Sequence, residues 1–318
     1  MIQITEKAMS ELCDKLSIDE KGLTFLGGGR EDSDGTAYTY LDGTKKRVLK
    51  ILAIPETEKD NLDRMEVRIR YAGYLGEHGV NLACPLQNCN GNLYEISQDN
   101  KHYYVAYIME FFEGKSPESN EMTDELVYQW GTVTGKMHAI AKSFRGFEGN
   151  PKFSHEYEID YFYNWCKDAE VKKAWHQMKQ ELGKLPQGIN DYGFVQNDNH
   201  QRNILRNDSG LTLLDFDCAG LQFFIQEITT PAQGIMFDIT GGMFSEVRER
   251  EQLKRFFDNF INGYETQNHL EQMWYDRIPL FVNYRRMLLF TCMQDWLNTV
   301  PEIKGGFIKS IAEPQKLW

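Results

Sequence analysis

The sequence has no long hydrophobic run. A helix that crosses a bilayer needs about 18 or more consecutive apolar residues, and the longest candidate, around residues 287–290, is far shorter. The N-terminal segment alternates charged and apolar residues, which is typical of an amphipathic helix and not of the apolar core of a signal peptide. These features predict a cytoplasmic protein without a membrane segment.

Paired cysteines and excess positive charge are also missing. The six cysteines are scattered over positions 13 to 292 and form no paired CxxC motif, which argues against a structural zinc site and favours reduced thiols. The net charge of −12 lacks the basic footprint that nonspecific nucleic-acid binding requires. It is compatible with a cationic substrate, although an acidic surface is more often a solubility feature.

The 318 residues suit one large or two smaller domains. The first third predicts a mostly antiparallel sheet with one long helix over residues 56–78, and Asp42-Gly43 is a strong hairpin signal. The expected strands cover residues 23–26, 37–41, 47–52, 92–97 and 103–111.

The character of the sequence changes near residues 113–117, and the pattern becomes helical from Thr123. Thr123 is suited to cap a helix whose apolar stripe includes Trp130 and Met137, and further helices are expected over residues 159–182, 248–268 and 276–299. We therefore predict an α+β fold with a β-rich N-terminal lobe over residues 1–112 and a larger helical lobe over residues 113–318.

The most specific motif is residues 195–217, VQNDNHQRNILRNDSGLTLLDFD. Asp198 can align an acceptor hydroxyl and accept its proton. Mg²⁺ prefers oxygen ligands shared between protein and phosphate, and Asn203 and Asp215 offer an amide and a carboxylate oxygen. The alternative is that these polar residues only form turns.

Three upstream features suit a nucleotide. Gly27-Gly28-Gly29 lies between two predicted strands, where backbone N–H groups can approach phosphates, or where a turn simply needs flexibility. Lys50 stands in an apolar strand and either reaches solvent or binds phosphate oxygens. Glu66, on the following helix, is either the partner of a buried Lys50 or one more solvent-facing charge.

The order of these features resembles that of the protein-kinase-like superfamily. The individual sequence motifs resemble those of its aminoglycoside phosphotransferase and choline kinase family. Residues 196–203, QNDNHQRN, are similar to the catalytic loop of that family, H-[GN]-D-x-H-x-x-N. Residues 108–114 resemble its hinge, and residues 130–141 resemble its helix with a Gly-x₃-Gly-x₂-His pattern. The resemblance spans about residues 23–230 and implies a bilobal protein-kinase-like fold.

The resemblance implies an ATP- and Mg²⁺-dependent phosphotransferase acting on a hydroxyl of a small molecule, such as an aminoglycoside, choline or homoserine. Asp198 would be the catalytic base, and His200 would contact the transferring phosphate. Asn203 and Asp215 would bind the metal. The nucleotide would be bound by Lys50 paired with Glu66, by the glycine loop Gly27, Gly28 and Gly29, and by the backbones of Glu110 and Phe112.

Two features depart from the family pattern. Gln196 replaces the histidine that braces the catalytic loop, and the glycine loop lacks a spaced fingerprint. A nucleotide-binding pseudokinase or sensor is therefore the alternative. A protein kinase is disfavoured because the segment after Asp217 is short and contains no Ala-Pro-Glu motif.

The acceptor would bind on the helical lobe, where aromatic and acidic side chains suit a cationic amine. Aromatic residues at helical spacing are more often part of a core. The candidates are Tyr161, Tyr163, Trp165, Tyr275, Asp276, Tyr284, Arg285, Asp295 and Trp296.

Overall fold

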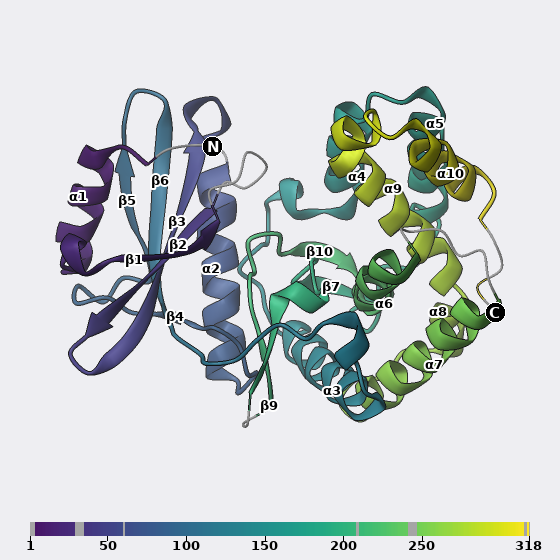
Figure 1. Ribbon diagram of the computed structural model, residues 1–318, viewed down its shortest axis with the longest axis horizontal. Helices are drawn as coiled ribbons and strands as arrows, with labels where there is room; N and C mark the ends of the chain where they lie inside the picture. Colours follow the sequence, from purple (N-terminus) through teal and green to yellow (C-terminus); the bar gives the residue numbers. More distant parts are fainter. Residues whose placement is uncertain are drawn as a thin grey trace. The chain divides into compact units, whose positions relative to one another are not determined.

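The computed structural model describes residues 4–28, 35–59, 61–207, 210–240, 247–314 and 317. The chain forms two compact units, which Figure 1 shows as a ribbon. The first comprises Met1–Glu113 and Thr212–Asp217, and the second comprises Gly114–Leu211 and Cys218–Trp318. Residues 212–217, which the sequence assigned to the helical lobe, pack with the first unit because backbone hydrogen bonds tie Leu213 to Asn81 and Ala83.

The first unit contains an antiparallel sheet, as the sequence predicts. Its strands follow the order β1-β2-β3-β6-β4, and β5 pairs with β6. The short β4 follows helix α2 and was not predicted. The bounds are β1 Thr24–Gly28, β2 Gly35–Asp42, β3 Lys45–Pro55, β4 Pro85–Leu86, β5 Glu95–Gln98 and β6 His102–Glu110.

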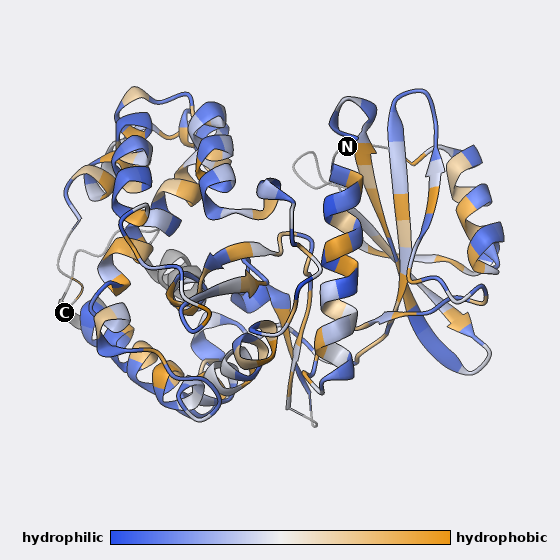
Figure 2. Cartoon of the chain, turned by 180° about the vertical axis from the view of Figure 1, so that it is seen from behind, coloured by the Kyte–Doolittle hydropathy of each residue, from blue (hydrophilic) through white to orange (hydrophobic). Residues whose placement is uncertain are grey.

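The side chains of this sheet alternate between two apolar clusters, as the two-residue period of a strand requires. On β3, Leu49 and Ile51 pack with helix α1 (Glu6–Leu16), whereas Leu52 and Ile54 pack with helix α2 (Asn61–Glu77). In Figure 2 the hydrophobic colour gathers along these strands, and the hairpin ends are hydrophilic. The alternation places Lys50 on the same face as Leu52.

The second unit is mainly helical. Strands β7 (Tyr192–Val195) and β10 (Gly220–Phe223) form an antiparallel pair, and β8 (Ile204–Asn207) pairs with β9 (Gly210–Leu213), whose last two residues belong to the first unit. The helices are α3 Asp124–Ala141, α4 His155–Trp165, α5 Ala169–Leu182, α6 Phe224–Thr240, α7 Val247–Tyr264, α8 Gln272–Tyr275, α9 Ile278–Leu297 and α10 Pro301–Ala312.

Short 3₁₀ helices complete the secondary structure, at Glu20–Gly22, Glu56–Glu58, Ser119–Glu121, Pro151–Phe153 and Gln201–Asn203. Among the residues that the structure describes, no helix combines the length and apolar character needed to cross a membrane.

Two helix predictions were wrong in detail. The helix expected over residues 159–182 is two helices, because Asp168 caps α5 by accepting from the backbone N–H groups of Glu170 and Val171, at 3.1 and 3.4 Å. Helix α6 was missed because its sequence is strongly apolar and contains Pro231. Its described side chains are buried on every side, from Phe224 to Ala232.

Helix α3 packs unusually close to α7. A Cβ added to Gly131 would lie 1.9 Å from the carbonyl oxygen of Phe260, and one added to Gly263 would lie 2.0 Å from that of Tyr128. Only glycine permits this backbone approach. The close packing holds α3 in a fixed position, from which its polar side chains support the loop after β7.

Candidate active site

The predicted site residues divide between the two units. In the first unit, Lys50 on β3 lies between two acids: its Nζ is 2.6 Å from Oδ2 of Asp217 and 3.0 Å from Oδ1 of Asp215. Tyr107, which is paired with Lys50 across β3 and β6, donates its hydroxyl to Oδ1 of Asp217 at 3.0 Å. The structure thus brings together two of the predicted residues, Lys50 and Asp215.

The charges around Lys50 and Asp217 shift the pKa values of both residues. Burial alone would lower the pKa of Lys50, but Asp215 and Asp217 outweigh it and raise that pKa above its ordinary value. Burial and the Asp215 carboxylate raise the pKa of Asp217, against the effect of Lys50. A lysine that stays charged beside two acids is suited to neutralise phosphate oxygens near Asp215, the predicted metal ligand.

The segment Asp215–Asp217 is held in an uncommon conformation. Asp215 has a φ of 57°, in the left-handed region that residues other than glycine seldom occupy. Phe216, between the two acids, packs edge-to-face on Tyr71 of α2 with 6.0 Å between ring centroids. The buried ring anchors the segment and leaves the Asp215 side chain 43% exposed, accessible to a cation.

The predicted pairing of Lys50 with Glu66 was wrong. Oε1 of Glu66 accepts from Arg70, one helical turn further along α2, at 2.8 Å. Burial would raise the pKa of Glu66, but hydrogen bonds from Tyr94 and Arg70 lower it. Helix α2 turns Met65 and Ile69 toward the sheet, so Glu66 lies beside the face that packs on the sheet. Lys50 is neutralised by Asp215 and Asp217 instead of Glu66.

The glycine segment begins in a strand. Gly28 has a φ of 88°, and a Cβ there would lie 2.2 Å from the carbonyl oxygen of Gly35, so this position requires glycine. Gly27 has no heavy atom within 4 Å of an added Cβ. Gly29 lies outside the described residues.

The predicted adenine-binding segment follows β6. Glu110 is the last residue of this strand and pairs with Arg47 at 3.3 Å, opposite it on β3. Nζ of Lys46 lies 4.0 Å from the ring centroid of Phe111. These contacts hold the side chains at the end of the strand, and Phe112 lies two residues beyond Glu110.

The second unit carries the predicted catalytic loop, after β7. Arg285 donates to Oδ1 of Asp198 at 2.6 Å. On the other carboxylate oxygen, Nε2 of His200 and Nδ2 of Asn203 each lie 3.3 Å from Oδ2. The structure therefore brings three predicted site residues into contact around one carboxylate, together with an arginine from α9.

This environment keeps Asp198 ionised. Burial alone would raise its pKa, but Arg285 and His200 outweigh that effect and lower the pKa to about 2. The backbone N–H of Arg202 donates to Nδ1 of His200 at 3.1 Å, which leaves the proton of a neutral imidazole on Nε2, facing Asp198. Asp198 is thus a carboxylate with fixed orientation and lone pairs available to a hydroxyl proton.

Asn203 is oriented to offer an oxygen. Its amide nitrogen donates to the backbone carbonyl of Asp198 at 2.9 Å, so this bond uses the nitrogen of the amide and not Oδ1. An amide oxygen and the exposed carboxylate of Asp215 are hard donors of the kind that Mg²⁺ prefers. The donor chemistry of both residues fits the predicted metal.

Buried polar contacts brace the catalytic loop. Oδ1 of Asn199 accepts from the indole N–H of Trp130 at 2.7 Å, and its amide donates to Thr134, also on α3, at 2.9 Å. The backbone N–H of Asn197, whose φ is 69°, donates to Glu227 of α6 at 2.7 Å, and Glu227 is 2.6 Å from Nε2 of the buried His138. The preceding residue, Gln196, is fully buried.

Two of these bracing residues escaped the sequence analysis, for different reasons. Glu227 was missed with the whole of α6, although a single acid within the apolar run FFIQEITTPA was a usable signal. Glu158 on α4 accepts hydrogen bonds from the Asn197 amide and the Tyr284 hydroxyl, and no motif marks it.

A hollow of about 350 Å³ lies on α4, lined by Tyr157, Asp160, Tyr161, Asn164 and Trp165. Two predicted acceptor residues are among these, and Tyr161 and Trp165 are 55% and 40% exposed. Lys179 pairs with Asp160 at 2.5 Å. In contrast, the predicted acceptor candidate Tyr284 is fully buried, as its helical spacing suggested.

Comparison with known proteins agrees with these features. The sequence matches the phosphotransferase enzyme family over residues 29–273, which is more than half of the chain. It is 24% identical to amicoumacin kinase of Bacillus subtilis (strain 168) over 96% of this chain and 91% of that protein.

Solved structures share the fold. The amicoumacin kinase hAmiN, in complex with AMP-PNP, Ca²⁺ and Ami, superposes with a TM-score of 0.81 at 22% identity over 94% of this chain and 90% of that one. A microcompartment-associated aminopropanol kinase gives 0.71 at 16% identity over 98% and 99%. Both the predicted resemblance and the predicted protein-kinase-like fold are confirmed. The chain belongs to the phosphotransferase enzyme family, among the small-molecule kinases.

Proposed function

We propose that the protein transfers the γ-phosphate of ATP, bound with Mg²⁺, to a hydroxyl group of a small molecule. The observation that carries this proposal is the Asp198 carboxylate, held ionised and fixed by Arg285, His200 and Asn203. The family assignment supports it, and a structural relative binds AMP-PNP, an ATP analogue, together with Ca²⁺.

In the proposed reaction, the acceptor oxygen attacks the γ-phosphorus and the bond from that phosphorus to the β,γ-bridging oxygen breaks, releasing ADP. Asp198 orients the acceptor hydroxyl and takes its proton. Its low pKa makes Asp198 a weak base, which suits a late proton transfer from a hydroxyl that becomes acidic as its oxygen bonds to phosphorus.

The nucleotide is assigned to residues of the first unit. Lys50 would bind phosphate oxygens, the backbone of Gly27, Gly28 and Gly29 would cover the phosphates, and the backbones of Glu110 and Phe112 would hold adenine. Asp215 and Asn203 would hold the Mg²⁺ ion, which neutralises phosphate charge when bound. His200 remains a proposed phosphate contact in addition to its contact with Asp198.

The acceptor is proposed to carry an amine as well as a hydroxyl. The hollow on α4 offers the exposed aromatic faces of Tyr161 and Trp165, which suit an ammonium group, whereas its acid, Asp160, is already paired with Lys179. Glu158, on the same helix, adds a carboxylate that accepts hydrogen bonds from two neutral side chains, Asn197 and Tyr284. Glu158, Tyr161 and Trp165 share one side of α4, because residues three and four apart face the same way.

The test is ADP release from Mg-ATP over a panel of aminoglycosides, choline, ethanolamine, homoserine and methylthioribose, with ³¹P NMR of the product. Ethanolamine against ethylene glycol isolates the contribution of the amine. We expect turnover that is lost in Asp198→Asn and kept in Asp258→Asn, an exposed acid on α7. Mg-ATP binding without turnover against any acceptor would contradict the proposal and favour the pseudokinase alternative.

A further inference from the structure

Helix α9 carries a buried arginine at the catalytic loop. Arg285 is 6% exposed, and the cost of burying a guanidinium is severe unless it is paired. Its partner is Oδ1 of Asp198 at 2.6 Å, a charge-assisted hydrogen bond of the short, strong kind. The sequence suggested Arg285 only as one of several acceptor candidates, whereas its position joins it to the proposed base.

Different residues contact the two carboxylate oxygens of Asp198. Arg285 holds Oδ1, whereas His200 and Asn203 hold Oδ2. A carboxylate restrained at both oxygens cannot rotate about its last torsion, and Oδ1, which has one donor, still has a second lone pair. Without Arg285, the remaining contacts, both at 3.3 Å and both to Oδ2, would leave Oδ1 free to turn away from an acceptor hydroxyl.

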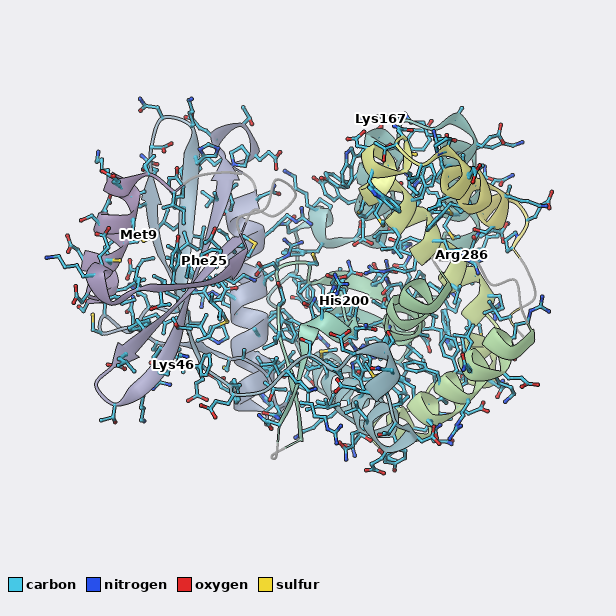
Figure 3. The ribbon with its side chains drawn as sticks, in the orientation of Figure 1. Met9, Phe25, Lys46, Lys167, His200 and Arg286 are labelled. Carbon is cyan, nitrogen blue, oxygen red and sulfur yellow. The ribbon has the colours of Figure 1, made fainter. Side chains whose placement is uncertain are left out.

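Arg285 is itself fixed by the fold. The preceding residue, Tyr284, donates to Glu158 and accepts from Gln222, and Glu158 in turn holds the side chain of Asn197. Two successive residues of α9 are therefore tied to two successive residues of the catalytic loop. The next residue, Arg286, points elsewhere and lies 3.5 Å from the carbonyl oxygen of Ser310. Figure 3 labels Arg286 and, on the catalytic loop, His200.

We propose that Arg285 is a positioning residue for phosphoryl transfer, which fixes the orientation of the Asp198 carboxylate and acts through it. The side chain of Arg285 is only 7% exposed, so little of its surface is available to a substrate. This inference rests on the proposed function, because it assigns Asp198 the acceptor hydroxyl.

The test uses the full chain, Mg-ATP and the panel acceptor with the highest turnover. Arg285→Gln keeps the length of the side chain and loses the fork of donors, and we expect kcat to fall about 10²-fold because misplacement of a reacting group by about 1 Å has such an effect. KM for ATP and for the acceptor stays unchanged. In Arg285→Ala, millimolar guanidinium ion restores part of kcat, and Arg285→Lys retains an intermediate rate.

Two comparisons separate positioning from a general structural effect. In the Asp198→Asn background, Arg285→Gln has no further effect on the residual rate, because the two residues act as one unit. Arg286→Gln, a buried arginine on the next position of α9, keeps the wild-type kcat.

Each outcome decides the proposal. An equal loss in Arg286→Gln, additive losses with Asp198→Asn, or a change confined to KM overturns the role of Arg285 while the proposed function stands. If Arg285→Ala does not fold, as judged by its thermal transition, Arg285→Lys and Arg285→Gln supply the same comparison. No turnover by the wild-type chain with any acceptor overturns the proposed function, and this inference with it.

Discussion

The ion pair between Asp198 and Arg285 predicts that the proposed catalytic base also stabilises the fold. The pKa of Asp198 falls from an ordinary 3.8 to about 2. At 1.36 kcal/mol for each pKa unit, the charged form stabilises the fold by about 2 kcal/mol at pH 7. This is an upper value, because the Asp198 side chain is 28% exposed and solvent screens part of the interaction.

We therefore expect Asp198→Asn, which mimics the protonated acid, to lower the free energy of unfolding by up to about 2 kcal/mol at pH 7. Because the pKa is depressed in the folded state, this contribution is fully present above the unfolded pKa of 3.8 and is lost as the pH falls through the folded pKa of about 2. The difference between wild type and variant should be constant from pH 7 to about 5 and roughly half as large at pH 3.

Urea unfolding followed by tryptophan fluorescence suits this measurement, because all six tryptophans belong to the second unit, as do Asp198 and Arg285. The same variant should lose turnover by about 10²–10⁴-fold, the usual contribution of a positioned acid or base. A stability difference that is absent at pH 7, or that is as large at pH 3 as at pH 7, would refute the electrostatic reasoning.

Three further substitutions test the first unit. Lys50→Met should lower turnover at subsaturating Mg-ATP by at least about 10-fold, because it removes the proposed phosphate contact and leaves Asp215 and Asp217 without their cation. Lys45→Met, at an exposed position of the same strand, is the control, and equal rates in the two variants would contradict the assignment. Glu66→Gln should change turnover little and stability by less than about 1 kcal/mol, because its partner Arg70 is exposed, and a loss as large as that of Lys50→Met would restore the rejected pairing. Gly28→Ala should lower the temperature of the thermal transition by the equivalent of about 1–3 kcal/mol, whereas Gly27→Ala, whose added Cβ has no heavy atom within 4 Å, should have a much smaller effect. Equal shifts in the two variants would show that the backbone conformation of Gly28 is not needed.

Local patterns predicted most elements of the first unit and the start of α3 in the second. The turn signal Asp42-Gly43 and the alternation along β3 gave the hairpin, and Thr123 caps α3 as expected, accepting from the backbone N–H of Leu126 at 3.2 Å. These features depend on residues near in sequence, so a single sequence contains them. Helix α6 was not predicted, because burial of its described residues on every side removes the polar face that makes a helix recognisable from sequence.

The partners of the charged residues depended on the tertiary structure. The two-residue period of β3 fixed the face of Lys50, yet both Glu66 and the acids at 215 and 217 could have met it there. Backbone hydrogen bonds of Leu213 with residues 81 and 83, about 130 positions away in sequence, hold the segment that carries both acids beside Lys50.

By itself, the sequence determined the chemistry available to this protein: an acid and an amide five residues apart, a second acid after an apolar strand, and a lysine within another strand. Their order was enough to indicate the family. Only the tertiary structure revealed what holds these groups, because the bracing residues come from distant helices and carry no motif. Arg285, 87 positions after Asp198, is the clearest case, because helix α9 brings its buried guanidinium to the carboxylate. A buried charge must be paired, and only the folded chain brings this pair together.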